Sequence, residues 1–287
     1  MRIVSFGEVL WDIYPDKKCL GGAPLNFAAH LARHGLDAAL WSAVGNDALG
    51  RETLTAVSDL GVDTRLILLH KDKPTGSCLV TLDERAVPSY NLLENVAYDE
   101  IGPLASCEGE VLYFGTLAQR SKINRRRLTE VLEGESFTEV FFDVNVRKPF
   151  FDKESLLLGL KYATIVKVSD EELPEVTAIL GESYASKDEA TERLAARCPR
   201  AKTVLLTCGK EGARAYDCRK KSVTVCPAYP AKVRSTVGAG DSFSAGYFYA
   251  YSEGRSQADC LSYASLLAAL VVSRDEAIPP YRPSDLS

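Results

Sequence analysis

The chain has 287 residues, of which 46% are hydrophobic and 25% are charged, and its formal net charge is −5. These values are ordinary for a globular protein that buries a large core, and they argue against a disordered chain and a strongly basic nucleic-acid-binding protein. No apolar run reaches the length of a transmembrane helix, and the first residues are typical of a strand rather than a signal peptide. We therefore expect a cytoplasmic protein that binds neither nucleic acid nor membrane.

The cysteines and histidines give no sign of a disulfide framework or a zinc site. The eight cysteines are scattered without a CxxC pair, and the three histidines do not cluster with them. Free thiols in a reducing compartment fit this pattern better than disulfides.

The first part of the chain alternates apolar runs with helical patterns. The run at 3–9 predicts a buried strand, and 11–14 alternates as a half-exposed strand does. A helical pattern at 25–34 ends at Gly35, which is a helix-terminating signal. The next predicted elements are a strand, a helix and a strand at 38–44, 48–60 and 65–69.

Between 74 and 95 the pattern changes to two short β-like runs. The runs at 77–82 and 89–93 flank a polar turn at 83–86 and predict a hairpin. Together with the segment 11–19, this hairpin could form a small separate sheet that acts as a lid. A lid over a site would exclude water from the reaction.

After about residue 109 strands and helices alternate, which is typical of a mainly parallel sheet with helices on both faces. In such α/β sheets, ligands bind beyond the carboxyl ends of the strands. No linker interrupts the pattern, so we expect one domain over 1–287. The predicted strands are 110–114, 140–143, 164–168 and 203–207, the helices lie near 122–132, 153–161, 170–180 and 187–197, and a hairpin at 213–216 and 222–226 precedes helices at 241–252 and 257–273.

A glycine-rich turn precedes the helical pattern at 241–252. Gly238 and Gly240 allow backbone conformations in which the N–H groups of 238–240 can surround an anion, and the helix behind them adds its positive end. Asp241 would then lie where a base could take a proton from a hydroxyl. The alternative is an ordinary turn in which Asp241 is the N-cap of the helix.

Two further turns carry polar residues near the ends of predicted strands. Gly22 and Asn26 open the first helix, where a ligand could approach the backbone, although a plain strand-to-helix turn fits equally. Asp143, Asn145 and Arg147 follow the strand at 140–143 and could bind sugar hydroxyls and phosphate oxygens. The alternative for the second group is a salt bridge between Asp143 and Arg147.

The strands at 164–168 and 203–207 are followed by two more candidate segments. Ser169 and Glu172 have the spacing of a helix capping box, and Glu172 could also approach a hydrated Mg²⁺. Gly209 and Gly212 after Thr207 could form a turn flat enough to lie against a nucleotide, or a simple hairpin turn. Neither GxxxxGK[ST] nor GxGxxG is present, so a P-loop or a dinucleotide-binding Rossmann site is not supported.

Three of these segments, in this order, resemble the signatures of the PfkB (ribokinase-like) family of carbohydrate kinases. They are GGAPLN at 21–26, VKVSDEEL at 166–173 and STVGAGDSF at 235–243. The resemblance covers residues 3 to about 280, and the segments 7–8, 114–118 and 142–147 are similar to the fructokinase branch. It implies a three-layer α/β/α sandwich with a small β lid, and transfer of the γ-phosphoryl group of ATP to a sugar hydroxyl.

The resemblance also implies roles for individual residues. Asp241 matches the catalytic base, and Glu172 matches an acidic residue associated with Mg²⁺. The anion hole corresponds to Gly238, Ala239 and Gly240. Asp12, Gly22 and Asn26 match sugar-binding positions. Asp143, Asn145 and Arg147 are further candidates for substrate binding. The residues on the nucleotide side are Lys167, Ser169, Thr207, Gly209 and Gly212.

Two departures from the family pattern concern a monovalent cation. Ser235 stands where the family usually has Asp, and Glu276-Ala277 stands where it often has Gly-Ala. A requirement for potassium is therefore left open. By analogy with the family, the lid strands of two chains could pair in a homodimer.

We expect an ATP-dependent sugar kinase, with fructose as the first candidate acceptor. Ribose, 2-keto-3-deoxygluconate, another small sugar or a nucleoside are the alternatives within the same class. A catalytically silent relative that binds sugar or nucleotide is an alternative of another class. The intact Asp241 and its glycines argue against it.

Overall fold

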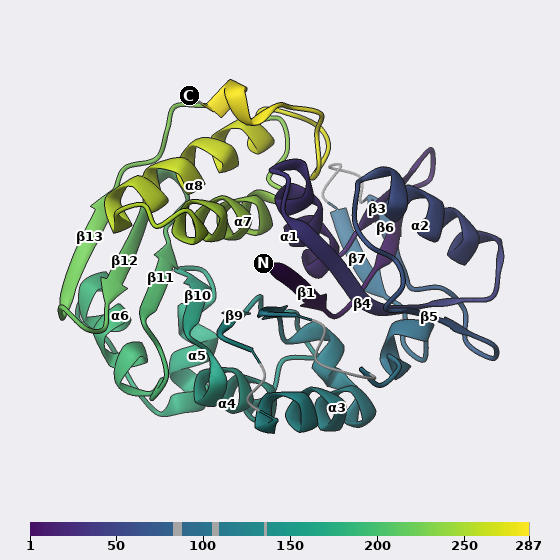
Figure 1. Ribbon diagram of the computed structural model, residues 1–287, viewed down its shortest axis with the longest axis horizontal. Helices are drawn as coiled ribbons and strands as arrows, with labels where there is room; N and C mark the ends of the chain where they lie inside the picture. Colours follow the sequence, from purple (N-terminus) through teal and green to yellow (C-terminus); the bar gives the residue numbers. More distant parts are fainter. Residues whose placement is uncertain (83–87, 105–108, 135–136, 287) are drawn as a thin grey trace.

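The computed structural model describes residues 1–82, 88–104, 109–134 and 137–286, and its main feature is one large sheet (Figure 1). Its strands are β1 (Arg2–Phe6), β4 (Asp37–Gly45), β5 (Ile67–His70), β8 (Val111–Phe114), β9 (Glu139–Asp143), β10 (Ile165–Ser169), β11 (Thr203–Thr207), β12 (Ala213–Asp217) and β13 (Ser222–Cys226). Their order across the sheet is β13-β12-β11-β10-β9-β8-β1-β4-β5. Neighbouring strands from β11 to β5 are parallel, whereas β12 is antiparallel to both β11 and β13.

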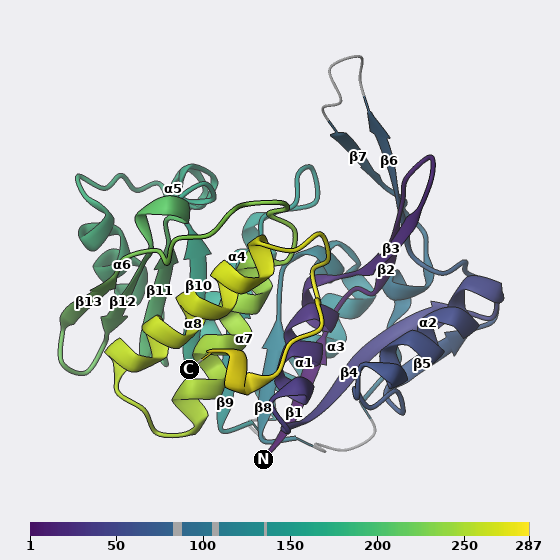
Figure 2. The ribbon, with the colours of Figure 1, turned by 90° about the horizontal axis from the view of Figure 1, so that it is seen from above.

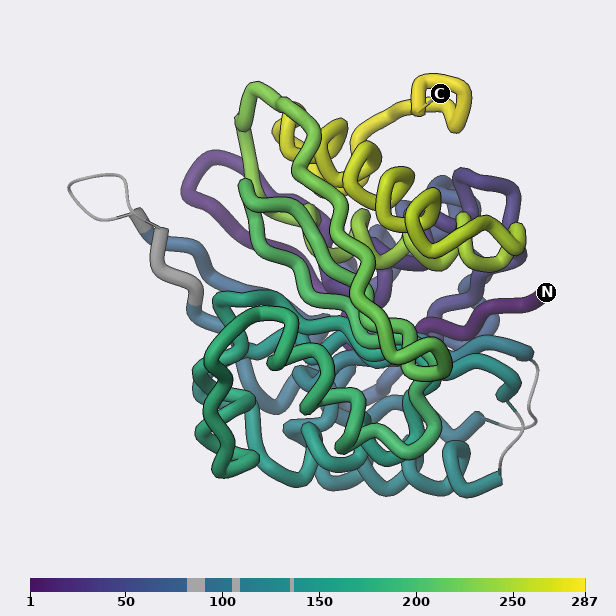
Figure 3. Tube along the Cα trace, turned by 90° about the vertical axis from the view of Figure 1, so that its left-hand side faces the viewer, coloured from purple at the N-terminus to yellow at the C-terminus, as the bar shows by residue number. Residues whose placement is uncertain are grey.

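Helices cover both faces of this sheet (Figures 1 and 3). One face carries α1 (Ala23–Arg33), α2 (Ala48–Asp59), α7 (Ala239–Ser252) and α8 (Gln257–Val272), and the other carries α3 (Lys122–Glu133), α4 (Lys153–Tyr162), α5 (Leu173–Leu180) and α6 (Lys187–Ala196). Alternate residues of β8 explain why both faces are buried: Val111 and Tyr113 join the core under α1 and α7, whereas Leu112 and Phe114 join the core over α3 and α4. The predicted three-layer α/β/α sandwich is confirmed.

A second, four-stranded sheet projects from the layers (Figure 2). It consists of β3 (Lys18–Gly21), β2 (Leu10–Ile13), β6 (Ser77–Leu82) and β7 (Pro88–Leu92), in that order. The parallel pairing of β2 with β6 joins the two chain segments that the sequence predicts as a lid. The small sheet is therefore present, and the predicted turn at 83–86 lies outside the described residues.

Several element boundaries differ from the predicted ones, each for a local reason. β1 ends at Phe6 because Gly7, with φ of 145°, turns the chain. α1 begins at Ala23, two residues before the predicted start, with Pro24 in its first turn. α5 begins only at Leu173, because 170–172 form a turn that the Glu172 side chain stabilises.

The described cysteines and helices agree with the expectations from composition. Seven cysteines are free thiols, five of them buried, with Cys19 exposed and Cys218 half-buried. In the part of the chain that the structure describes, no helix has the length and hydropathy needed to cross a membrane.

Candidate active site

The glycine-rich turn forms the start of α7. Gly238 is the N-cap residue, with a left-handed φ of 78°, and a Cβ there would lie 2.7 Å from the Cβ of Ala277. Only glycine fits that position without strain. The Ala239 N–H bonds to the Thr236 carbonyl at 3.3 Å. Helix geometry leaves the N–H groups of Gly240 and Asp241 without an intrahelical acceptor, so they can hold an anion.

Asp241 is the third residue of α7 and not its N-cap, so the alternative interpretation from the sequence is wrong. Its Oδ2 accepts a hydrogen bond from Asn26 Nδ2 at 2.6 Å. The fold therefore brings together two candidate residues that are 215 positions apart in the chain. A half-buried carboxylate at the mouth of an anion-binding helix end can accept a proton from a nearby hydroxyl.

Asn26 carries the most informative unsatisfied atom of the site. The residue is only 4% exposed, and its Oδ1 is buried without a hydrogen-bond partner. Because a carboxylate only accepts hydrogen bonds, the amide nitrogen must face Asp241 and the amide oxygen must point elsewhere. Buried polar atoms are rarely left unpaired, so this oxygen is able to accept a hydrogen bond from a donor that binds here.

The turn at Gly21-Gly22 positions Asn26. Gly22 has φ of 118° and is the N-cap of α1, and a Cβ there would lie 2.4 Å from the Glu8 carbonyl oxygen. The Asn26 N–H donates to the Gly22 carbonyl at 2.9 Å, which fixes Asn26 one turn into the helix. The segment is a strand-to-helix turn, and its glycines also allow a close approach of α1 to the end of β1.

Asp12 lies in the middle of β2, within the small sheet, and is half-buried. Cys78 is its direct partner on β6, and the Cys78 thiol donates a hydrogen bond to the Asp12 carboxylate. Burial raises the pKa of Asp12, while Cys78 and the nearby Arg147 oppose that shift. Burial also raises the pKa of the Cys78 thiol to about 11, so the thiol remains a donor at neutral pH.

Glu8 is a candidate that the sequence analysis did not place in the site. It is 4% exposed, and it follows β1 at the carboxyl edge of the sheet. Burial raises its pKa to about 7, opposed by backbone N–H groups and Arg147 and reinforced by Asp241. Its position near the end of the first predicted strand, at 3–9, is a signal that could have identified it, because ligands bind at that edge of the sheet.

Asp143 lies beneath the site rather than on its surface. It is fully buried and accepts hydrogen bonds from Ser244 Oγ at 2.9 Å and Tyr113 Oη at 3.4 Å. It pairs with Lys167 at 3.0 Å, so the interpretation of Asp143 and Arg147 as a salt bridge is wrong. Complete burial raises the pKa of Asp143 to about 6, and the Lys167 ammonium opposes the rise.

Lys167 is placed under the anion-binding turn. A Cβ on Gly240 would lie 3.0 Å from Lys167 Nζ, so the ammonium group sits against the first turn of α7. Burial pulls the pKa of Lys167 down, but the Asp143 and Glu172 carboxylates outweigh it and the net direction is upward. The ammonium therefore stays charged and adds positive potential below the turn.

Asn145 and Arg147 follow β9 on the same side of the sheet. Asn145 is 8% exposed and has a left-handed φ of 42°, and the Thr116 hydroxyl donates to its carbonyl at 3.2 Å. Such backbone strain in a non-glycine residue is more common at functional sites. Arg147 is exposed, and its charge acts on Glu8 and Asp12.

Glu172 joins two strand-end loops. One carboxylate oxygen accepts the Val146 N–H at 2.8 Å and the other accepts the Ser169 N–H at 2.7 Å. This is half of the predicted capping box, formed one turn before α5. Among the described residues no group of three or more acidic, histidine or cysteine side chains could hold a metal directly. Glu172, held rigidly with lone pairs to spare, fits a water-mediated contact to a Mg²⁺ that arrives with a nucleotide.

Thr207, Gly209 and Gly212 surround the end of β11. Gly212 has φ of 91°, and a Cβ there would lie 2.1 Å from the Cys226 carbonyl oxygen, so the loop packs tightly on β13. A Cβ on Gly209 would meet nothing within 4 Å, which leaves a flat open surface. Lys187, which the sequence analysis did not select, ties the neighbouring loops together by pairing with Asp170 at 3.0 Å and Glu211 at 2.8 Å.

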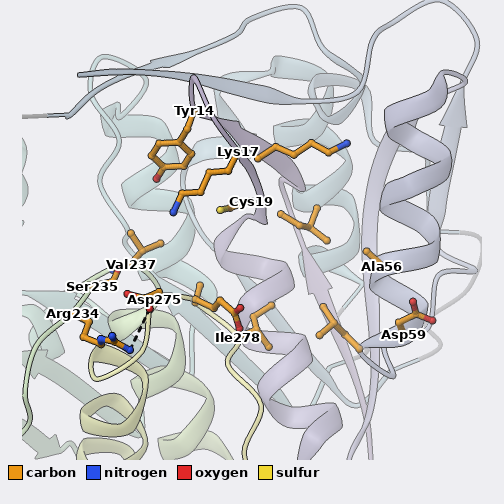
Figure 4. Close-up of a pocket in the computed structure, with 15 residues that line it drawn as sticks. Tyr14, Lys17, Cys19, Ala56, Asp59, Arg234, Ser235, Val237, Asp275 and Ile278 are labelled. Carbon is orange, nitrogen blue, oxygen red and sulfur yellow. Dashed lines mark hydrogen bonds and ion pairs between the residues drawn. The ribbon is translucent and has the colours of Figure 1, made fainter. Parts of the chain in front are cut away.

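A cavity of about 630 Å³ adjoins the anion-binding turn (Figure 4). Its walls come from Tyr14 and Lys17 in the β2–β3 connection, from β3 at Lys18–Leu20, from the end of α2, and from the loops 234–237 and 275–278. Ser235 and Glu276, the two departures from the family pattern, both line it, beside an ion pair between Arg234 and Asp275 at 3.4 Å. Here Gly238 packs against Ala277, so the loop 275–278 supports the turn.

Comparison with known proteins gives a family match and full-length relatives. The model of the pfkB family of carbohydrate kinases matches residues 12–284. A probable fructokinase-5 of Arabidopsis thaliana is 26% identical and covers 96% of this chain and 93% of its own. A 5-dehydro-2-deoxygluconokinase of Clostridium beijerinckii is 28% identical and covers 95% of this chain and 87% of its own.

The fold comparison agrees with the sequence comparison. The solved structure of a sugar kinase from Pyrococcus horikoshii in complex with ATP is 27% identical, with a TM-score of 0.84. It covers 99% of this chain and 96% of its own. The arrangement of sheet, helices and small sheet described above is therefore shared along the whole chain.

Proposed function

The chain belongs to the PfkB family of carbohydrate kinases, and on that premise we propose that it transfers the γ-phosphoryl group of ATP to a hydroxyl of fructose. One observation carries the acceptor half of this proposal. The unpaired Asn26 Oδ1 lies next to the amide nitrogen that holds Asp241, at the open end of α7. A sugar hydroxyl that donates to this oxygen would be held beside the proposed base.

In the proposed reaction Asp241 takes the proton of the acceptor hydroxyl while the hydroxyl oxygen attacks the γ-phosphorus. The bond from that phosphorus to the bridging oxygen of ADP breaks as the new bond forms, roughly in line. The free N–H groups of Gly240 and Asp241 and the Lys167 ammonium stabilise the charge on the transferring group, whereas the Ala239 N–H is bonded to the Thr236 carbonyl. The positions of Asp12, Gly22 and Asn26 favour sugar binding between α1 and the small sheet, which would act as a lid.

The nucleotide half is proposed along the ends of β10 and β11. Ser169, Thr207, Gly209 and Gly212 would contact ATP, and Asn145 and Arg147 would face the transferring phosphate from the neighbouring loop. Asp143 is retained as a positioning residue for Lys167 rather than a sugar ligand, because it is fully buried. A bound Mg²⁺ would neutralise phosphate charge, with Glu172 as its water-mediated contact.

Other acceptors remain as alternatives within this proposal. The relative named 5-dehydro-2-deoxygluconokinase indicates that sugar acids belong in the test beside ribose, 2-keto-3-deoxygluconate and nucleosides. We also propose a cytoplasmic location. We further propose a homodimer paired through the small sheets, whose molar mass light scattering after size-exclusion chromatography would measure. A catalytically silent sugar-binding relative is the alternative of another class.

The experiment is an ATP-consumption screen with Mg²⁺ over sugars, sugar acids, sugar phosphates and nucleosides, with and without potassium. Turnover with fructose above the other acceptors is the expected result. Higher turnover with another acceptor would replace fructose but retain the kinase. Sugar binding without ATP consumption for any acceptor would favour the silent relative. Equal rates with and without potassium would show that turnover does not require potassium.

A further inference from the structure

The backbone holds Glu8 firmly at the carboxyl edge of the large sheet. β1 lies between β8 and β4, away from both sheet edges, and Glu8 follows it after the turn at Gly7. A Cβ on Gly7 would lie 2.6 Å from Pro24 Cγ, and a Cβ on Gly22 would lie 2.4 Å from the Glu8 carbonyl oxygen. The start of α1 therefore packs directly on the residue, one helical turn from Asn26.

The Glu8 carboxyl group faces charged and titratable groups from four directions. It accepts its own N–H and the N–H of Ala23 at the start of α1. Arg147, after β9, and Asp241, on α7, both act on its charge. Its own charge acts on Tyr98, near the root of the small sheet, and on Tyr113, in β8. The carboxyl group is therefore close enough to Asp241, the proposed base, and to Tyr98 for their charges to interact.

We propose that Glu8 binds a hydroxyl of the acceptor sugar and makes the site select neutral sugars over sugar acids. The inference rests on the proposed function, since it concerns the same acceptor. Three carboxyl groups, from Glu8, Asp12 and Asp241, lie in this part of the molecule, and the exposed Arg147 is a cation whose charge acts on both Glu8 and Asp12. A sugar hydroxyl can donate to such carboxylates, whereas a carboxylate on the ligand would be repelled.

Protonation of Glu8 gives this selection a pH dependence. Burial raises the pKa of Glu8 to about 7, so the group loses its charge as the pH falls through that value. The repulsion of a sugar acid then weakens, while the acid itself keeps its charge at pH 5.5 to 6 because an ordinary carboxyl group has a pKa of about 4. The preference for neutral sugars should therefore be larger at about pH 8 than at about pH 6.

A purely structural role is the competing explanation. A carboxylate at a helix start stabilises the helix dipole and satisfies a free N–H, and Glu8 does so for Ala23. Asp152 offers a matched control, because it accepts the Ser155 N–H at 2.8 Å at the start of α4 and takes no part in the proposed site. A purely structural role predicts that Glu8→Gln, like Asp152→Asn, differs from wild type only in melting temperature.

The test compares wild type, Glu8→Gln and Asp152→Asn with fructose, gluconate and 2-keto-3-deoxygluconate at pH 6 and pH 8. For Glu8→Gln we expect the KM for the neutral sugar to rise about tenfold, since a hydrogen bond to a charged carboxylate is replaced by a weaker one to a neutral amide. The KM for ATP should stay near wild type. The ratio of kcat/KM for neutral sugar over sugar acid should fall, and its change with pH should disappear. Asp152→Asn should keep the wild-type values.

Each outcome separates this inference from the proposed function. If none of the tested sugars leads wild type to consume ATP, the proposed function fails and Glu8 has no acceptor to select. If wild type turns over fructose but Glu8→Gln changes only the melting temperature, the role of Glu8 in selection is wrong and the kinase stands. If Glu8→Gln does not fold, the test uses the wild-type ratio of kcat/KM for neutral sugar over sugar acid. A ratio that does not change between pH 6 and pH 8, or one that favours the sugar acids, overturns the inference.

Discussion

The proposed acceptor side and the proposed nucleotide side of the site hold their charged groups in different ways. On the acceptor side, Asn26 keeps a buried oxygen without a partner, and the Asp12 carboxyl group has the Cys78 thiol as its side-chain donor. On the nucleotide side, Lys167 pairs with Asp143, and both oxygens of Glu172 accept backbone N–H groups.

Some polar groups of the site would therefore gain their partner only from a bound ligand, whereas others already have partners within the fold. A buried polar atom without a partner costs free energy in the free protein, and a ligand that satisfies it recovers that cost on binding. A paired buried charge has no such gain to offer, so it serves to position its neighbours. We infer that substitutions on the acceptor side change sugar binding and turnover, and that those beneath the nucleotide side also change stability.

Asp241→Asn gives the largest expected effect. The amide can still accept from Asn26 but cannot take a proton, so we expect turnover to fall by about 10³-fold or more while the fold and sugar binding persist. Steady-state kinetics with fructose and sugar binding by calorimetry measure both quantities. Near-normal turnover would show that Asp241 is not the base.

Lys167→Met tests the buried ion pair between Lys167 and Asp143 beneath the proposed nucleotide side. Removing the ammonium leaves the Asp143 carboxylate buried without a cation, which typically costs about 3–5 kcal/mol. We expect a large loss of melting temperature together with reduced turnover, and partial recovery of stability when Asp143→Asn is added. Lys187→Met, which removes a half-buried lysine that pairs with Asp170 and Glu211, is the control and should change the melting temperature much less. Equal losses in both variants would contradict the distinction.

Glu172→Gln probes the proposed water-mediated metal contact. The substitution removes the charge and turns one acceptor into a donor that faces a backbone N–H. We expect the concentration of Mg²⁺ for half-maximal rate to rise about tenfold, with the KM for fructose little changed. An unchanged Mg²⁺ titration would leave Glu172 as a connection between loops only.

Cys78→Val gives the smallest expected effect and tests the donor to Asp12. The change removes one hydrogen bond to a carboxylate at nearly constant volume, so the KM for fructose should rise about threefold to tenfold with kcat retained. Cys78→Ser keeps a donor and should restore most of the affinity. Cys198→Val, at a buried thiol far from the site, is the control for loss of a cysteine. Serine and valine variants with equal KM would exclude the thiol as a donor.

The sequence predicted the elements well where local signals were strong. The pattern after residue 109 predicted β8 to β11 within one or two residues, because alternate faces of each strand are buried under different helices. The turn at Gly238 was predicted from its glycines, and its left-handed φ of 78° explains the need for them. The starts of α5 and α7 differed because side chains and backbone of neighbouring loops set them.

The sequence by itself determined the family, the layered fold and the residue types of the site, because those depend on periodicity and on short motifs with fixed local geometry. Only the tertiary structure decided which residues meet. It joined Asn26 to Asp241 at 2.6 Å, buried Asp143 against Lys167, and buried Glu8 where the charge of Asp241 acts on it. Such contacts join residues from distant parts of the chain, and their distances and burial depend on how helices pack on the sheet, which no local pattern encodes.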